Sequence, residues 1–150
     1  MASENTKPPT PRLSEYPGSP LDWVQGFGDA DEAIAYASIF WPEFVTHDGC
    51  VFLEFDDIRY AEWMNVTGGN RQRVEATMNH RHIMHLFGQQ RPRPTRERLI
   101  QLGRLLKQMW ECKLKREFPD RQLLVRFNEE DASELSDYEI RFHQVLPPAT

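Results

Sequence analysis

The chain contains few cysteines and no long apolar run, and each shortage excludes a class of protein. Only Cys50 and Cys112 occur among the 150 residues, which is too few for a disulfide framework. No segment approaches the roughly 18 uninterrupted apolar residues of a membrane-spanning helix, and the first twenty residues lack the apolar stretch of a secretory signal. We therefore expect a soluble, cytoplasmic protein with reduced thiols.

Basic residues are outnumbered by acidic ones, 18 to 23, and they are unevenly distributed. The formal net charge of −5 argues against general affinity for nucleic acids or anionic membranes. Between residues 22 and 62 ten acidic residues face one basic residue, Arg59, whereas residues 91–118 carry an excess of basic side chains. We expect these two regions to neutralise each other in the fold.

Residues 1–19 contain several prolines and show no hydrophobic periodicity. Pro8, Pro9 and Pro11 lie among small polar residues, and proline supplies no backbone donor to a helix or a sheet. We predict a flexible proline-rich tail over residues 1–19 and a single domain over residues 20–150, which is long enough to bury one hydrophobic core.

Capping residues, and apolar residues that recur every three or four positions, predict about four helices in that domain. The first spans residues 29–41, the second starts at Asp56 or Asp57 and ends at Gly68, the third follows Asn70 and carries three histidines, and the longest spans residues 96–118.

Two β-hairpins are predicted beside these helices. Asp48-Gly49 separates two β-prone runs, and this dipeptide favours a tight turn with positive φ at both central positions. Residues 121–127 and 138–146 alternate apolar and polar side chains and are joined by an acidic loop. Together the elements predict the α+β class, with an antiparallel sheet built from the two hairpins.

The segment NHRHIMH holds three of the five histidines and is a candidate metal site. On a helix, His82 and His85 lie near each other, whereas His80 points roughly 200° away from His82. Further ligands would have to come from His47 and Cys50, which flank the first predicted hairpin turn.

His47, Cys50, His82 and His85 form a nitrogen and sulfur set suited to structural zinc. The alternative is that the histidines are ordinary polar residues of a helix and that no cofactor is bound. The segment is not HExxH, so no glutamate is placed as the base of a metalloprotease.

A second candidate is an anion site formed by Arg71 and Arg73. They follow two glycines at the start of a helix, where free backbone donors favour a negative charge. The alternative is a helix-to-helix corner with solvated arginines, because the pattern is far from a complete phosphate-binding loop.

The acidic loop offers a candidate surface for a partner protein. Its carboxylates can steer a basic protein into place, although such a run also serves solubility. The residues assigned to this surface are Glu129, Glu130, Asp131, Glu134 and Asp137.

The basic region 91–116 could instead contact nucleic acid through Arg91, Arg93, Arg104 and Lys115. We favour this less, because Glu111 shares the exposed helix face and can pair with Lys115 at four-residue spacing.

The sequence shows no nucleophile with an adjacent base, no cofactor loop and no complete metal motif, so we expect a binding or regulatory protein rather than an enzyme. In size, acidity and tryptophan content the chain resembles, in general type and without a motif match, bacterial immunity or inhibitor proteins that cap a basic partner. The alternatives are a small-ligand or structural-zinc protein and a nucleic-acid-binding module.

Overall fold

The computed structural model describes residues 9–88 and 93–145, and its contacts divide the chain into two compact units, residues 1–37 and 38–150. In the first unit a short 3₁₀ turn, η1 (Leu13–Glu15), precedes α1 (Pro20–Phe27) and most of α2 (Ala30–Phe40). With α3 (Asp57–Val66), α4 (Arg71–Met78) and α5 (Arg96–Glu117), the described part of the chain has five α-helices rather than the predicted four.

The additional helix is α1, and its start has a clear local cause. The Ser19 hydroxyl accepts a hydrogen bond from the Asp22 amide at 3.1 Å, and the Asp22 carboxylate accepts one from the Ser19 amide at 2.9 Å. This capping box satisfies two free donors of the first turn. Residues that precede α1 contact it, because Trp23 Nε1 donates to the Pro11 carbonyl at 2.8 Å.

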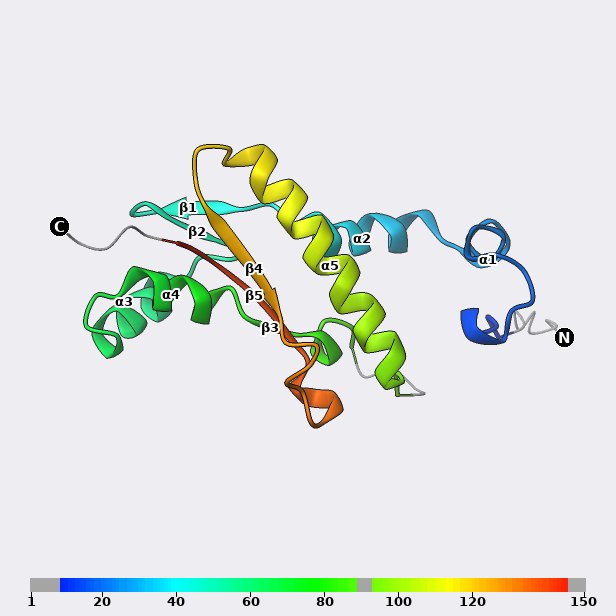
Figure 1. Ribbon diagram of the computed structural model, residues 1–150. Coiled ribbons are helices and arrows are strands. Elements are labelled where there is room, and N and C mark those ends of the chain that lie inside the picture. Colours follow the sequence, from blue (N-terminus) through cyan, green and yellow to red (C-terminus); the bar gives the residue numbers. More distant parts are fainter. Residues whose placement is uncertain (1–8, 89–92, 146–150) are drawn as a thin grey trace, which may run out of the picture. The chain divides into compact units, whose positions relative to one another are not determined.

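The second unit confirms the mixed α+β class (Figure 1). It contains two separate antiparallel sheets, however, and not the single sheet of two hairpins that was predicted. β1 (Val45–His47) pairs with β2 (Cys50–Phe52) across a turn in which Asp48 and Gly49 have φ of 50° and 78°, as the dipeptide predicts. The other sheet has the order β3-β5-β4, in which β4 (Leu123–Phe127) pairs with β5 (Glu139–Gln144). The short strand β3 (Arg81–His82) was not predicted.

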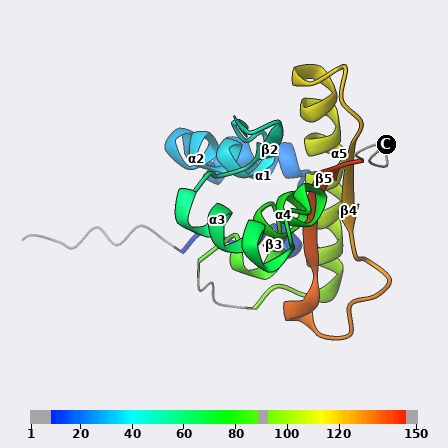
Figure 2. The ribbon, with the colours of Figure 1, turned by 90° about the vertical axis from the view of Figure 1, so that its left-hand side faces the viewer.

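The main core lies between α5 and the β4–β5 pair. Figure 1 and Figure 2 both show α5 running alongside these strands. Trp110 and Leu106 of α5 and Phe142 of β5 are at most 2% exposed, and burial of each large apolar side chain contributes about 1.5–3 kcal/mol. The Trp110 indole also donates to the Ile39 carbonyl of the same unit at 2.9 Å.

Helices α3 and α4 meet at a glycine corner. Gly68 and Gly69 have φ of 63° and 81°, a region that residues with a Cβ rarely adopt. The Asp56 and Asn70 side chains cap α3 and α4 by accepting hydrogen bonds from the amides three residues later. These helix starts and the glycine stop were predicted from the sequence.

Side chains of α4 fill the space between the two sheets. Glu75, which is fully buried, accepts hydrogen bonds from the Val51 amide of β2 and the Gln144 amide of β5, both at 2.7 Å. One turn later Asn79 accepts from the Leu53 amide and donates to the Val51 carbonyl. The edges of β2 and β5 are thus joined through buried side chains.

No helix in the described ranges is both long enough and apolar enough to cross a membrane.

Candidate functional site

The β4–β5 loop, residues 128–138, carries the acidic residues assigned to partner binding. Hydrogen bonds close its base: Asn128 Nδ2 donates to the Asp137 carbonyl at 2.7 Å, and the Glu139 amide donates to Asn128 Oδ1 at 2.8 Å. The loop ends in a 3₁₀ turn, η3 (Leu135–Asp137), directly before β5. This end of the sheet lies beside the N-terminal end of α5 (Figure 1).

Asp137 stabilises the loop from within. Its carboxylate accepts hydrogen bonds from the Glu134 amide at 2.9 Å and the Ser133 hydroxyl at 3.0 Å. These bonds, with the Glu134 amide contributing most, hold the pKa of Asp137 below its usual value. Asp137 therefore stays ionised and serves the loop's own structure.

Arg96, the first residue of α5, holds the loop from the helix side. Its guanidinium donates to the Ser133 carbonyl at 3.0 Å and to the Tyr138 hydroxyl at 2.6 Å, with a longer bond of 3.4 Å to the Ala132 carbonyl. Tyr138 is 1% exposed, so this contact ties the loop to the core. A planar guanidinium with several donors is suited to such a clamp.

The remaining acidic residues of the loop divide into paired and exposed groups. Glu129 forms an ion pair with Arg104 of α5, and hydrogen bonding to that arginine lowers the pKa of Glu129. Glu130, Asp131 and Glu134 are exposed, and no side-chain ion pair engages them within the described residues. Three of the five predicted residues are thus presented to solvent by an ordered loop.

The prediction that the histidines lie on a helix is wrong. α4 ends at Met78, after which the chain becomes extended and Arg81 and His82 pair with β5. His85 belongs to a 3₁₀ turn, η2 (Ile83–His85). The edge of β5 that faces away from β4 accounts for the difference. Its backbone groups pair with Arg81 and His82, and they would lose these partners if α4 continued.

The extended chain brings His80 and His82 together with Glu139 of β5. One ligand atom from each of these three side chains lies within 4.8 Å of the other two. His80 Nε2 and Glu139 Oε2 are 2.6 Å apart, and His82 Nδ1 is 2.8 Å from the Ser136 carbonyl. Among the described residues, no other group of three or more histidine, cysteine or acidic side chains is close enough together to hold a metal ion.

His47 and Cys50, the other residues of the predicted zinc set, lie opposite each other in the β1–β2 hairpin. His47 is exposed and stacks on Phe55 with ring centroids 4.1 Å apart, while Cys50 is 1% exposed. Burial is the largest cause that raises the pKa of Cys50 to about 11. A thiolate ligand is therefore disfavoured at this position.

Arg71 and Arg73, the predicted anion site, lie at the start of α4. The Arg71 guanidinium donates to the Asp48 carboxylate at 3.1 Å, so this cation already has an anionic partner. Arg73 is exposed, and its amide donates to the capping side chain of Asn70.

The basic region contains both paired and exposed side chains. Arg104 is paired with Glu129, whereas Arg93 and Lys115 are exposed. Arg91 lies outside the described residues.

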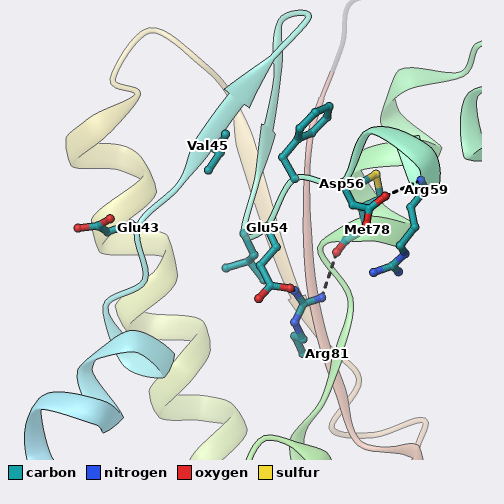
Figure 3. Close-up of a pocket in the computed structure, with 9 residues that line it drawn as sticks. Glu43, Val45, Glu54, Asp56, Arg59, Met78 and Arg81 are labelled. Carbon is teal, nitrogen blue, oxygen red and sulfur yellow. Dashed lines mark hydrogen bonds and ion pairs between the residues drawn. The ribbon is translucent and has the colours of Figure 1, made fainter. Parts of the chain in front are cut away.

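An open depression of about 510 Å³ lies between the β1–β2 hairpin, the start of α3 and the end of α4. Figure 3 shows Arg81 directed toward Glu54, and the two groups are 3.4 Å apart. The same guanidinium donates to the Met78 and His80 carbonyls at 3.0 and 2.9 Å. Arg81 thereby satisfies carbonyl groups at the end of α4, which gives it a structural role.

Comparison with known proteins gives no relative: no family model, no curated protein and no solved structure matches the chain. The metal site predicted from the sequence omitted Glu139, and it placed His80 on the far side of a helix from His82. The available signal was the spacing of His80 and His82, because residues two apart share a face only if the chain is extended.

Proposed function

We propose that the protein is a small acidic binding or regulatory protein of the cytoplasm, whose β4–β5 loop docks on a basic surface of a partner protein. Immunity and inhibitor proteins that cap a basic toxin or nuclease act in this general manner. The observation that carries the proposal is the Arg96 clamp, which orders a loop that presents exposed carboxylates.

Order in the unbound loop matters for affinity. A partner that binds a flexible loop must offset the entropy lost when the loop becomes fixed, whereas a clamped loop has already lost most of that freedom. Arg96, Asn128 and Asp137 supply the clamp and leave Glu130, Asp131 and Glu134 facing solvent.

The charge layout favours a basic partner over an acidic one. The net charge of −5 repels acidic surfaces, and exposed carboxylates accelerate encounters with basic ones at low ionic strength. Two arginines of α5, Arg96 and Arg104, are already engaged by the loop. All charged side chains within residues 128–138 are acidic.

The test compares two variants that change charge equally. One carries Glu130→Gln, Asp131→Asn and Glu134→Gln; the control carries Asp57→Asn, Glu62→Gln and Asp120→Asn, all exposed and outside the loop. Each variant removes three negative charges, which changes the net charge from −5 to −2.

Affinity capture from an extract of the native host, at low and moderate salt, should recover one basic protein with the wild type and the control. The loop variant should lose it. Failure to capture a protein at either salt concentration, or equal capture by all three proteins, would contradict the proposal.

A further inference from the structure

We propose that His80, His82 and Glu139 form a binding site for a divalent transition metal, with zinc as the expected ion. Their arrangement arises from pairing of β3 with β5, which places His82 directly opposite Glu139. His80 lies two residues before His82, and in extended chain residues two apart project to the same side. Three metal-binding side chains therefore meet at one end of the sheet.

The ligand atoms are close enough to converge on one ion. Zinc lies about 2.0–2.1 Å from its nitrogen and oxygen ligands, so tetrahedral ligands are separated by roughly 3.3 Å. His80 Nε2 and Glu139 Oε2 are 2.6 Å apart, and one ligand atom from each of the three side chains lies within 4.8 Å of the other two. A cation can take the place of the His80–Glu139 contact once small side-chain movements separate the two ligand atoms.

The surroundings of His82 match those of a metal ligand. Its Nδ1 is 2.8 Å from the Ser136 carbonyl, an acceptor, so Nδ1 carries the proton and donates. The lone pair is then on Nε2. Histidines that bind metals commonly donate their second ring nitrogen to a carbonyl or carboxylate, which fixes the tautomer and the ring orientation.

Access and composition favour zinc over harder ions. The His80 and Glu139 side chains are 32% and 26% exposed, so an ion can reach them from solvent. Two imidazoles and one carboxylate suit zinc better than calcium or magnesium, which prefer oxygen ligands. His85 is adjacent, with its ring centroid 5.4 Å from that of His82, and offers a further ligand.

This site differs from the one that the sequence pattern indicates. His82 belongs to both sets and His85 lies beside it in both, but His80 and Glu139 take the places of His47 and Cys50. The distinction can be tested directly, because His47 stacks on Phe55 in the β1–β2 hairpin and is not part of the cluster.

The experiment is calorimetric titration of ZnCl₂ into the full chain, prepared without a histidine tag and freed of metal with a chelator. The wild type should bind one equivalent. Glu139→Gln, which keeps a hydrogen-bonding side chain beside His80, and His82→Asn should each weaken binding by about 100-fold or more. The matched control, His47→Asn, should bind as the wild type does.

Thermal melting of each metal-free variant shows whether it folds. If His82→Asn does not fold, zinc binding by Glu139→Gln tests the proposal alone. No saturable binding to the wild type, unchanged binding by Glu139→Gln, or loss of binding by His47→Asn would overturn the proposal. Cobalt-loaded protein provides a second readout. It should lack the thiolate-to-metal absorption that coordination by Cys50 would produce, and the presence of that absorption would also overturn the assignment.

Discussion

The carboxylate of Glu75 accepts two hydrogen bonds from Gln144, one from its backbone amide at 2.7 Å and one from its side-chain amide at 2.6 Å. Both residues are buried, at 0% and 8% exposure. A further bond from the Val51 amide joins β2 to the same carboxylate. One side chain of α4 therefore connects two strands that do not pair directly.

Replacing Glu75 by alanine should destabilise the protein by about 3–5 kcal/mol, because the Val51 and Gln144 amides would remain buried without an acceptor. Denaturant unfolding measures the loss. The control Glu75→Gln retains one acceptor oxygen and should lose less. Equal stability of Glu75→Ala and the wild type would show that this contact does not hold the sheets together.

Gly103 is required by the packing of α5 on β4. A Cβ at this position would overlap three carbons of the Phe127 ring. Alanine favours the helix by about 1 kcal/mol, but overpacking of a core typically costs about 1–3 kcal/mol. Because the overlap is with a ring rather than a flexible chain end, we expect Gly103→Ala to lower stability in thermal unfolding. A higher melting temperature would mean that Phe127 moves aside freely.

His143 should make stability depend on pH. Its Nδ1 is buried without a hydrogen-bond partner in the described residues, and burial, followed by Arg126 and Arg141, lowers the pKa of its side chain. The folded state then keeps this imidazole neutral while the unfolded state binds a proton below about pH 6.5. Stability should therefore fall as pH decreases from about 6.5 toward the folded-state pKa.

Unfolding of the wild type and His143→Leu at a series of pH values measures this effect. The leucine variant should show a smaller decline in the free energy of unfolding below about pH 6.5. Arg141→Thr, which removes one of the two nearby cations, should show an intermediate decline. Identical pH profiles for wild type and His143→Leu would contradict the assignment.

Arg96 should control the mobility of the β4–β5 loop. Arg96→Ala removes donors to Ser133 and Tyr138, and a loss of about 1.4 kcal/mol in local stability would accelerate hydrogen exchange of loop amides roughly tenfold. Arg98→Ala is the control, because Arg98 donates to Gln101 of its own helix. Unchanged exchange in Arg96→Ala would show that the loop is ordered by other contacts.

Local chemistry made much of this fold predictable. Asp48-Gly49 specified a turn by its tolerance of positive φ, and Asn70 specified a helix start by its side-chain acceptor. Neither depends on distant residues. The same holds for α5, whose apolar spacing is long enough to indicate a helix without tertiary information.

The histidine segment shows where local reasoning fails. Its sequence is compatible with a continued helix, and only the edge of β5 makes an extended chain preferable. His80 and Glu139 are 59 positions apart, so their contact cannot be read from spacing. The acidic loop was recognised from its composition. The sequence could not show that Glu129 pairs with α5 and that Asp137 bonds within the loop, because both contacts depend on the folded structure.

The docking role of the β4–β5 loop is tested most directly by a photo-crosslinking amino acid placed at Ser136, an exposed loop residue whose replacement leaves every carboxylate in place. A matched probe at Asn65, exposed at the end of α3, serves as the control. After irradiation in native-host extract, the probe at Ser136 should link to one basic protein, and added salt should reduce the yield because exposed charges are screened. A link that forms at Asn65 and not at Ser136, or no link from Ser136 at low salt, would contradict the account.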